Sequence, residues 1–80
     1  MDDTTRKVLK RVVAQFHTGI RKPFGLDGNI YKLMQYSNDE TYVSMDVPGR
    51  TYYEELPVPL TVDGLHGAII QMQVKVVHEA

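Results

Sequence analysis

The chain has 80 residues and no cysteine, and this absence removes several classes of site at once. Without thiols it cannot have a disulfide framework, a zinc site with thiolate ligands or a cysteine nucleophile. Proteins without disulfides are typical of reducing compartments, so the sequence predicts a cytoplasmic location. No run approaches the roughly 18 consecutive apolar residues of a membrane-spanning helix, and we expect no membrane association.

Groups that could carry catalysis or bind a ligand are also scarce. The only serines are Ser37 and Ser44, which lie in or beside a predicted hairpin. The three histidines have neither the spacing of a helical pair nor that of a zinc site. The loop Gly25-Leu26-Asp27-Gly28 lacks the Lys-Ser/Thr of a phosphate-binding loop. We therefore expect no catalytic residue, no metal and no cofactor, and a protein that is not an enzyme.

Length and composition predict a single domain over residues 1–80. Apolar residues make up 42% of the chain and charged residues 24%, which is typical of a folded protein. At this size roughly 60% of the surface of the unfolded chain is buried on folding, so the core is thin. A second copy would add buried surface, and we expect a homodimer or higher oligomer.

The first part of the chain predicts an amphipathic helix over about residues 4–19. Its apolar residues recur at three- and four-residue spacing, and they share one flank. Thr4 or Thr5 can cap the N-terminus, and Pro23 cannot continue the helix. The apolar flank consists of Val8, Leu9, Val12, Val13, Phe16 and Ile20.

Short β-prone runs separated by turn residues follow over about residues 29–78, and the last of them has the clearest apolar–polar alternation. A type II turn at Pro48-Gly49 would splay paired strands, so we expect a change of direction there and not a tight hairpin. The predicted extended runs are residues 30–36, 41–47, 51–55, 56–62 and 68–77, with 56–62 at an edge because of its prolines.

These elements together predict the α+β class. One N-terminal amphipathic helix packs on a four- to five-stranded antiparallel sheet. A small, partly open barrel is the alternative.

Charge is divided unevenly along the chain. Residues 1–32 hold seven basic and three acidic side chains, a net charge of +4, whereas the remaining residues hold two basic and seven acidic side chains, a net charge of −5. This asymmetry indicates two surfaces for different neighbours, or one surface that finds the opposite one on a second copy.

Residues 39–55 combine three tyrosines with five carboxylates, opposed only by Arg50. Tyrosine is enriched at protein interfaces, and clustered carboxylates attract a basic partner. The sequence therefore predicts a small protein-interaction module, a regulator or inhibitor that blocks a larger partner with a basic surface. A virus or mobile element is a plausible origin for it. The predicted partner-binding residues are Tyr42, Asp46, Tyr52, Tyr53, Glu54 and Glu55.

Alternation along the strands restricts this set. Tyr42 and Asp46 point outward if the valines between and beside them point inward. In the next run, successive residues point to opposite faces. Only one of the pairs Tyr52/Glu54 and Tyr53/Glu55 can then share the outward face, and the sequence leaves open which.

The basic flank of the helix predicts an alternative function, nucleic-acid binding. Several cations on one surface are enough for phosphate contacts, although such helix faces are often merely solvated. A structural subunit of a larger assembly is a third possibility. The alternative nucleic-acid-binding residues are Arg6, Lys7, Lys10, Arg11, Arg21 and Lys22.

Overall fold

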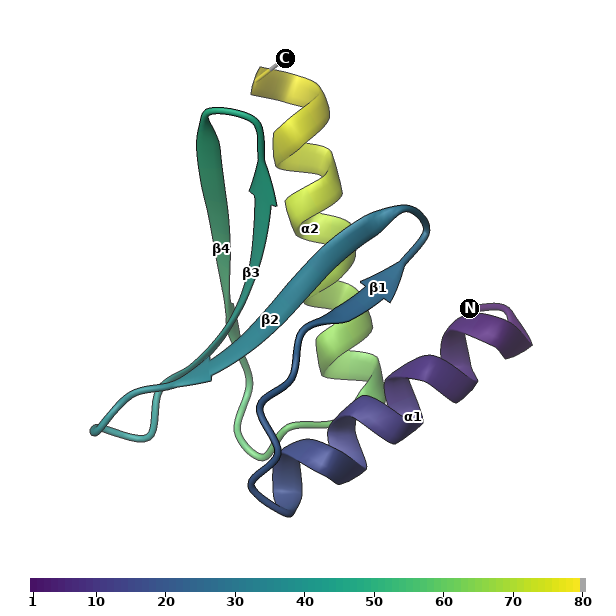
Figure 1. The fold of residues 1–80 in the computed structure, drawn as a ribbon, viewed down its shortest axis with the longest axis vertical. Helices are drawn as coiled ribbons and strands as arrows, with labels where there is room; N and C mark the ends of the chain where they lie inside the picture. Colours follow the sequence, from purple (N-terminus) through teal and green to yellow (C-terminus); the bar gives the residue numbers. More distant parts are fainter. Residues whose placement is uncertain (80) are drawn as a thin grey trace.

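A computed structural model describes residues 1–79, with two helices and one four-stranded antiparallel sheet (Figure 1). The predicted α+β class is confirmed, with the N-terminal helix packed against the sheet. The sheet is an open meander in the order β1-β2-β3-β4, so the barrel alternative is wrong. The elements are α1 (Asp3–His17), β1 (Phe24–Leu26), β2 (Asn29–Gln35), β3 (Thr41–Val47), β4 (Arg50–Leu56) and α2 (Val62–Glu79).

The N-terminus of α1 is capped by Asp2. Its Oδ1 accepts a hydrogen bond from the Thr5 N–H at 2.7 Å. The carboxylate satisfies a free N–H and also complements the positive end of the helix dipole, so neither Thr4 nor Thr5 is the cap. Thr5 is instead buried on the inward flank.

The C-terminus of α1 ends in a Schellman motif. Gly19 has a φ of 87°, a conformation that favours glycine. The Gly19 N–H donates to the carbonyl of Phe16 at 3.1 Å. The Ile20 N–H donates to the carbonyl of Gln15 at 2.9 Å. These bonds satisfy the last carbonyls and end the helix at His17, two residues before the predicted end.

Two-residue turns join the outer pairs of strands. Asp27 and Gly28 have φ values of 52° and 83°, the positive values that a type I′ hairpin needs between β1 and β2. Pro48-Gly49 also forms a tight hairpin, which the sequence did not predict. Seven residue pairs between β3 and β4 hold the strands together despite the twist that this turn favours.

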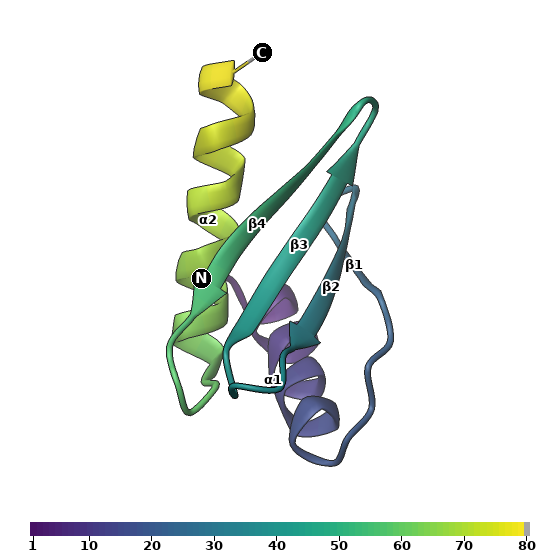
Figure 2. The same cartoon turned by 90° about the vertical axis from the view of Figure 1, so that its left-hand side faces the viewer.

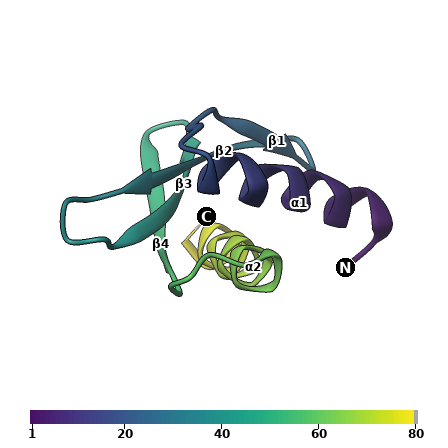
Figure 3. The same ribbon diagram turned by 90° about the horizontal axis from the view of Figure 1, so that it is seen from below.

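Alternation divides the sheet into an inner face, which the helices cover, and an outer face, which they leave open. Figure 3 shows α1 and α2 on the same side of the curved sheet. α2 packs on β4 and β3, and α1 packs on α2 and β1. The core lies between them and consists of Leu9, Val12, Phe16, Leu26, Tyr31, Leu33, Val43, Met45, Tyr52, Leu56, Leu60, Leu65, Ala68, Ile69 and Met72.

The strand predicted over residues 68–77 is wrong, because this segment belongs to α2. Apolar residues are so dense here that both a two-residue and a helical period fit. As a helix the segment covers β3 and β4, whereas a fifth strand would leave their inner face exposed. Ile70 and Val74, which a strand would bury, are 42% and 44% exposed. The buried residues are Leu65, Ala68, Ile69 and Met72, at three- and four-residue spacing.

A side-chain cap starts α2. Thr61 Oγ1 accepts a hydrogen bond from the Gly64 N–H at 3.0 Å. The edge strand predicted over residues 56–62 does not form, since the chain after Leu56 leads directly into this cap. The β-rich part therefore runs over residues 24–56 and not to residue 78.

Substitution of two adjacent isoleucines distinguishes helix from strand. Ile69 is 1% exposed and Ile70 is 42% exposed. We expect Ile69→Asp to lower the free energy of unfolding by about 4 kcal/mol, since it buries an unpaired charge, and Ile70→Asp to change it by less than about 1 kcal/mol. Chemical denaturation followed by circular dichroism measures both. The reverse order would indicate a strand with Ile70 facing the core.

Candidate functional site

The outer face of the sheet is directed away from the helices, as Figure 2 shows for α2 and Figure 3 for both. Cross-strand pairing fixes which side chains lie next to one another on it. Lys32, Ser44 and Tyr53 form one row. Met34, Tyr42 and Glu55 form the next. By alternation the outer face consists of Ile30, Lys32, Met34, Tyr42, Ser44, Asp46, Thr51, Tyr53 and Glu55.

The register settles which tyrosine–glutamate pair joins Tyr42 and Asp46. Tyr53 pairs with Ser44, and Glu55 pairs with Tyr42, so both lie on the outer face. Tyr53 is 51% exposed. Four of the six residues predicted to bind a partner are therefore brought together on one surface.

The other two predicted residues, Tyr52 and Glu54, lie on the inner side. Tyr52 is 8% exposed and belongs to the core. Burial, together with the nearby negative charge of Glu79, raises the pKa of the Tyr52 hydroxyl. Glu54 forms an ion pair with Lys75 of α2, with 2.6 Å between Nζ and Oε2. Both side chains thus help to attach α2 to β4.

Ion pairing separates the acidic residues into two groups. Glu54 pairs with Lys75, and Glu79 pairs with Arg50 at 2.8 Å, all four on β4 and α2. No ion pair within residues 1–79 involves the carboxylates of the outer face. Lys32 lies on the same face but forms no ion pair with a carboxylate of residues 1–79. Four acids without an ion pair in this described part of the chain therefore lie on the outer face or at its β2–β3 hairpin: Asp39, Glu40, Asp46 and Glu55.

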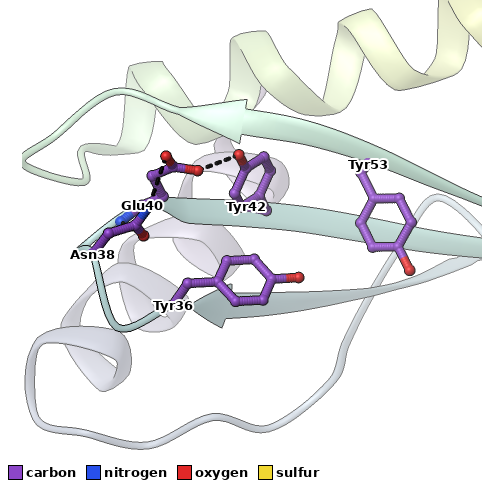
Figure 4. A pocket seen from close by; sticks show the side chains of 5 residues that line it. All are labelled: Tyr36, Asn38, Glu40, Tyr42 and Tyr53. Atoms are coloured by element: carbon purple, nitrogen blue, oxygen red, sulfur yellow. Dashed lines mark hydrogen bonds between the residues drawn. The ribbon is translucent and has the colours of Figure 1, made fainter.

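A depression of about 280 Å³ lies at the β2–β3 end of this face. Figure 4 shows three tyrosine rings around it, with a carboxylate and an amide at the hairpin end. The rings of Tyr36 and Tyr42 meet edge to face, with centroids 5.4 Å apart. The lining residues are Tyr36, Asn38, Glu40, Tyr42 and Tyr53.

Two hydrogen bonds hold Glu40 in place at the edge of this depression. Asn38 Nδ2 donates to Glu40 Oε1 at 2.8 Å, and the Tyr42 hydroxyl donates to Glu40 Oε2 at 2.5 Å. This donation, with burial, raises the pKa of the Tyr42 hydroxyl to about 12, because the carboxylate disfavours a second negative charge beside it. Tyr42 therefore remains a donor at neutral pH.

The hairpin geometry brings these groups together. The Tyr36 N–H donates to the Glu40 carbonyl at 2.9 Å, and Asp39 has a φ of 65°, which reverses the chain. Tyr36, Asn38 and Glu40 are not among the residues predicted from the sequence. A weak signal exists, since Tyr36 and Glu40 flank the predicted reversal and Glu40 lies two residues before Tyr42.

The alternative basic residues fall into two sets. Arg21 is held at the end of α1, where its Nη1 donates to the Phe16 carbonyl at 2.7 Å and its guanidinium lies 3.9 Å from the Phe16 ring centre. Its Nη2 also donates to Gln35. Arg21 therefore fastens α1 to the end of β2. The remaining five, Arg6, Lys7, Lys10, Arg11 and Lys22, are exposed.

The described residues give no further indication of chemistry. Within residues 1–79, no group of three His, Cys, Asp or Glu side chains is placed to hold a metal ion. No helix in that range is long and apolar enough to span a membrane. No known protein family, curated protein or solved structure matches this chain.

The Tyr42–Glu40 hydrogen bond can be tested by titration. We expect Glu40→Gln to lower the pKa of Tyr42 from about 12 towards the ordinary value near 10, measured from the Cζ resonance of this tyrosine by NMR. Because the folded-state pKa is raised, the stabilisation from this proton is present below about pH 10 and is lost as pH rises towards 12.

Asp46→Asn is the matched control for this titration. Asp46 accepts a hydrogen bond from Thr51 at 2.6 Å and does not line the depression. The Asp46→Asn substitution removes one negative charge from the same face, as Glu40→Gln does. Because Asp46 is not among the groups that raise the pKa of Tyr42, we expect that pKa to stay near its wild-type value. Equal shifts in the two variants would attribute the raised pKa to the general negative field and not to Glu40.

Proposed function

We propose that this chain is a non-enzymatic protein-interaction module, a regulator or inhibitor that covers a basic surface of a larger protein with the outer face of its sheet. The observation that carries this proposal is that both helices lie on one side of the sheet. The other side presents exposed tyrosine together with carboxylates that no ion pair within residues 1–79 neutralises. The effect on the partner would be steric.

The chemistry of the outer face suits such an interface. Tyr53, 51% exposed on the edge strand β4, offers a large contact area with only two side-chain torsions to restrict. Asp46 and Glu55 flank it and would steer a basic partner towards the sheet. Lys32 is the only basic side chain of the outer face, so the surface remains acidic. We propose Tyr42, Asp46, Tyr53 and Glu55 as its partner-binding residues.

The proposed cellular location and origin of the protein rest on the sequence alone. The absence of cysteine supports a cytoplasmic location, and the small size suits an inhibitor from a virus or mobile element. Self-association and a role as a subunit of a larger assembly stay predictions, as does nucleic-acid binding by the basic flank of α1.

Affinity capture with wild-type protein and variants tests the proposal. After a captured partner is purified, we expect Tyr53→Ala to weaken its binding by about 2 kcal/mol, as for a central interface tyrosine. Glu55→Lys should mainly slow association, with an effect that shrinks as salt is added. Calorimetry measures the first effect and stopped-flow kinetics the second.

The control is the double variant Lys7→Glu with Lys10→Glu, which reverses two charges on the exposed basic flank of α1. It should retain the affinity of the wild type. If this variant alone loses binding, and the wild type shifts DNA or RNA in a salt-dependent mobility assay, the nucleic-acid function replaces the one proposed.

A further inference from the structure

The depression at the β2–β3 end of the outer face has the composition of a site for a single cationic side chain. Three tyrosine rings line it, and Figure 4 shows Tyr36, Tyr42 and Tyr53 on different sides of an open centre. The faces of aromatic rings attract cations. Tyr36 and Tyr53 are each 51% exposed, whereas the core tyrosine Tyr31 is fully buried. These two rings are therefore free to contact a partner.

The carboxylate of Glu40 supplies a directed acceptor in the same place. Each of its oxygens already accepts one hydrogen bond, from Asn38 or from Tyr42, and these bonds fix its orientation. A carboxylate oxygen has two lone pairs, so one remains available on each oxygen. No basic side chain within residues 1–79 forms an ion pair with Glu40. A forked donor could therefore bind both oxygens at once.

The same protein already holds an arginine in this way elsewhere. Arg50 places its guanidinium 4.9 Å from the centre of the Tyr52 ring. It also contacts both carboxylate oxygens of Glu79, at 2.8 and 3.4 Å. The Glu79 carboxylate also helps to raise the pKa of the Tyr52 hydroxyl, so it acts on this ring as well. The Tyr42–Glu40 pair reproduces the tyrosine and the carboxylate of this arrangement without the arginine.

We propose that the depression lined by Tyr36, Tyr42, Tyr53, Asn38 and Glu40 is a binding site for an arginine side chain of the partner protein. This inference rests on the proposed function and specifies what the basic partner presents. A planar guanidinium can stack on a tyrosine ring while it donates two parallel hydrogen bonds to Glu40. A lysine ammonium is compact and strongly hydrated, and it has neither the flat face nor the fork.

Titration with short peptides tests this site without knowledge of the partner. The probes are acetyl-Gly-Arg-Gly amide and acetyl-Gly-Lys-Gly amide, which have the same charge, added to isotope-labelled protein and followed by NMR. We expect the arginine peptide to shift the ring signals of Tyr36, Tyr42 and Tyr53, and to bind at least about fivefold more tightly than the lysine peptide. Glu40→Gln should weaken its binding about tenfold, because one charge-assisted pair of hydrogen bonds is lost.

Asp46→Asn is again the matched control, since it removes one charge from the same face outside the depression. It should change the affinity by no more than about twofold, as for a distant exposed charge. Tyr36→Ala is a second test of the site in case Glu40→Gln disturbs the hairpin, because Tyr36 is exposed. We expect it also to weaken binding of the arginine peptide.

Several results would overturn the arginine site. These are no binding of the arginine peptide, equal affinity for the two peptides, and equal losses in Glu40→Gln and Asp46→Asn. Tighter binding of a matching trimethyl-lysine peptide would instead assign the three rings to a quaternary ammonium. None of these results touches the proposed function, which fails separately if Tyr53→Ala and Glu55→Lys leave the affinity for the captured partner unchanged.

Discussion

Burial of one face of the sheet beneath both helices is the constraint on which the rest of the structure depends. A chain of 80 residues has material for a single buried layer. Met72 and Leu65 of α2 and Leu9 of α1 are fully buried in it, against the inner side chains of the strands. Since both helices are used on that side, the second face of the sheet remains exposed. The candidate interface is thus a consequence of how this small core is built.

The ion pairs follow from the same arrangement. α2 lies along β4, and its two pairs with that strand, Lys75–Glu54 and Glu79–Arg50, fix it there at two positions. Exposed pairs of this kind contribute little energy singly, and their clearer consequence is the distribution of charge. They neutralise acids on the helix side of the sheet. Asp46 and Glu55 on the outer face have no ion-pair partner within residues 1–79, and with Lys32 they leave this face with a small excess of negative charge.

Tyrosine and glutamate meet twice in this protein, with different results. On the inner side, Arg50 lies over the ring of Tyr52 and forms an ion pair with Glu79. These three side chains join the start of β4 to the end of α2. On the outer side, Tyr42 and Glu40 meet at the β2–β3 hairpin without a cation within the described residues. The first group is part of the fold. The second is an oriented acceptor beside aromatic rings.

The sequence by itself determined the features that local chemistry controls: the α1 helix, the reversal after Tyr36, the Asp27-Gly28 turn, and the outward direction of Tyr42 and Asp46. Residue spacing and turn chemistry act over a few residues, so they can be read without the rest of the fold. The tertiary structure alone decided three things. Residues 68–77 fit both periods, and only packing on β3 and β4 selects the helix. The register with β3 places Tyr53 and Glu55 outward and Tyr52 inward. The depression is lined by residues of the β2–β3 hairpin, β3 and β4. Their rings and the Glu40 carboxylate come together only when these strands pair in the sheet.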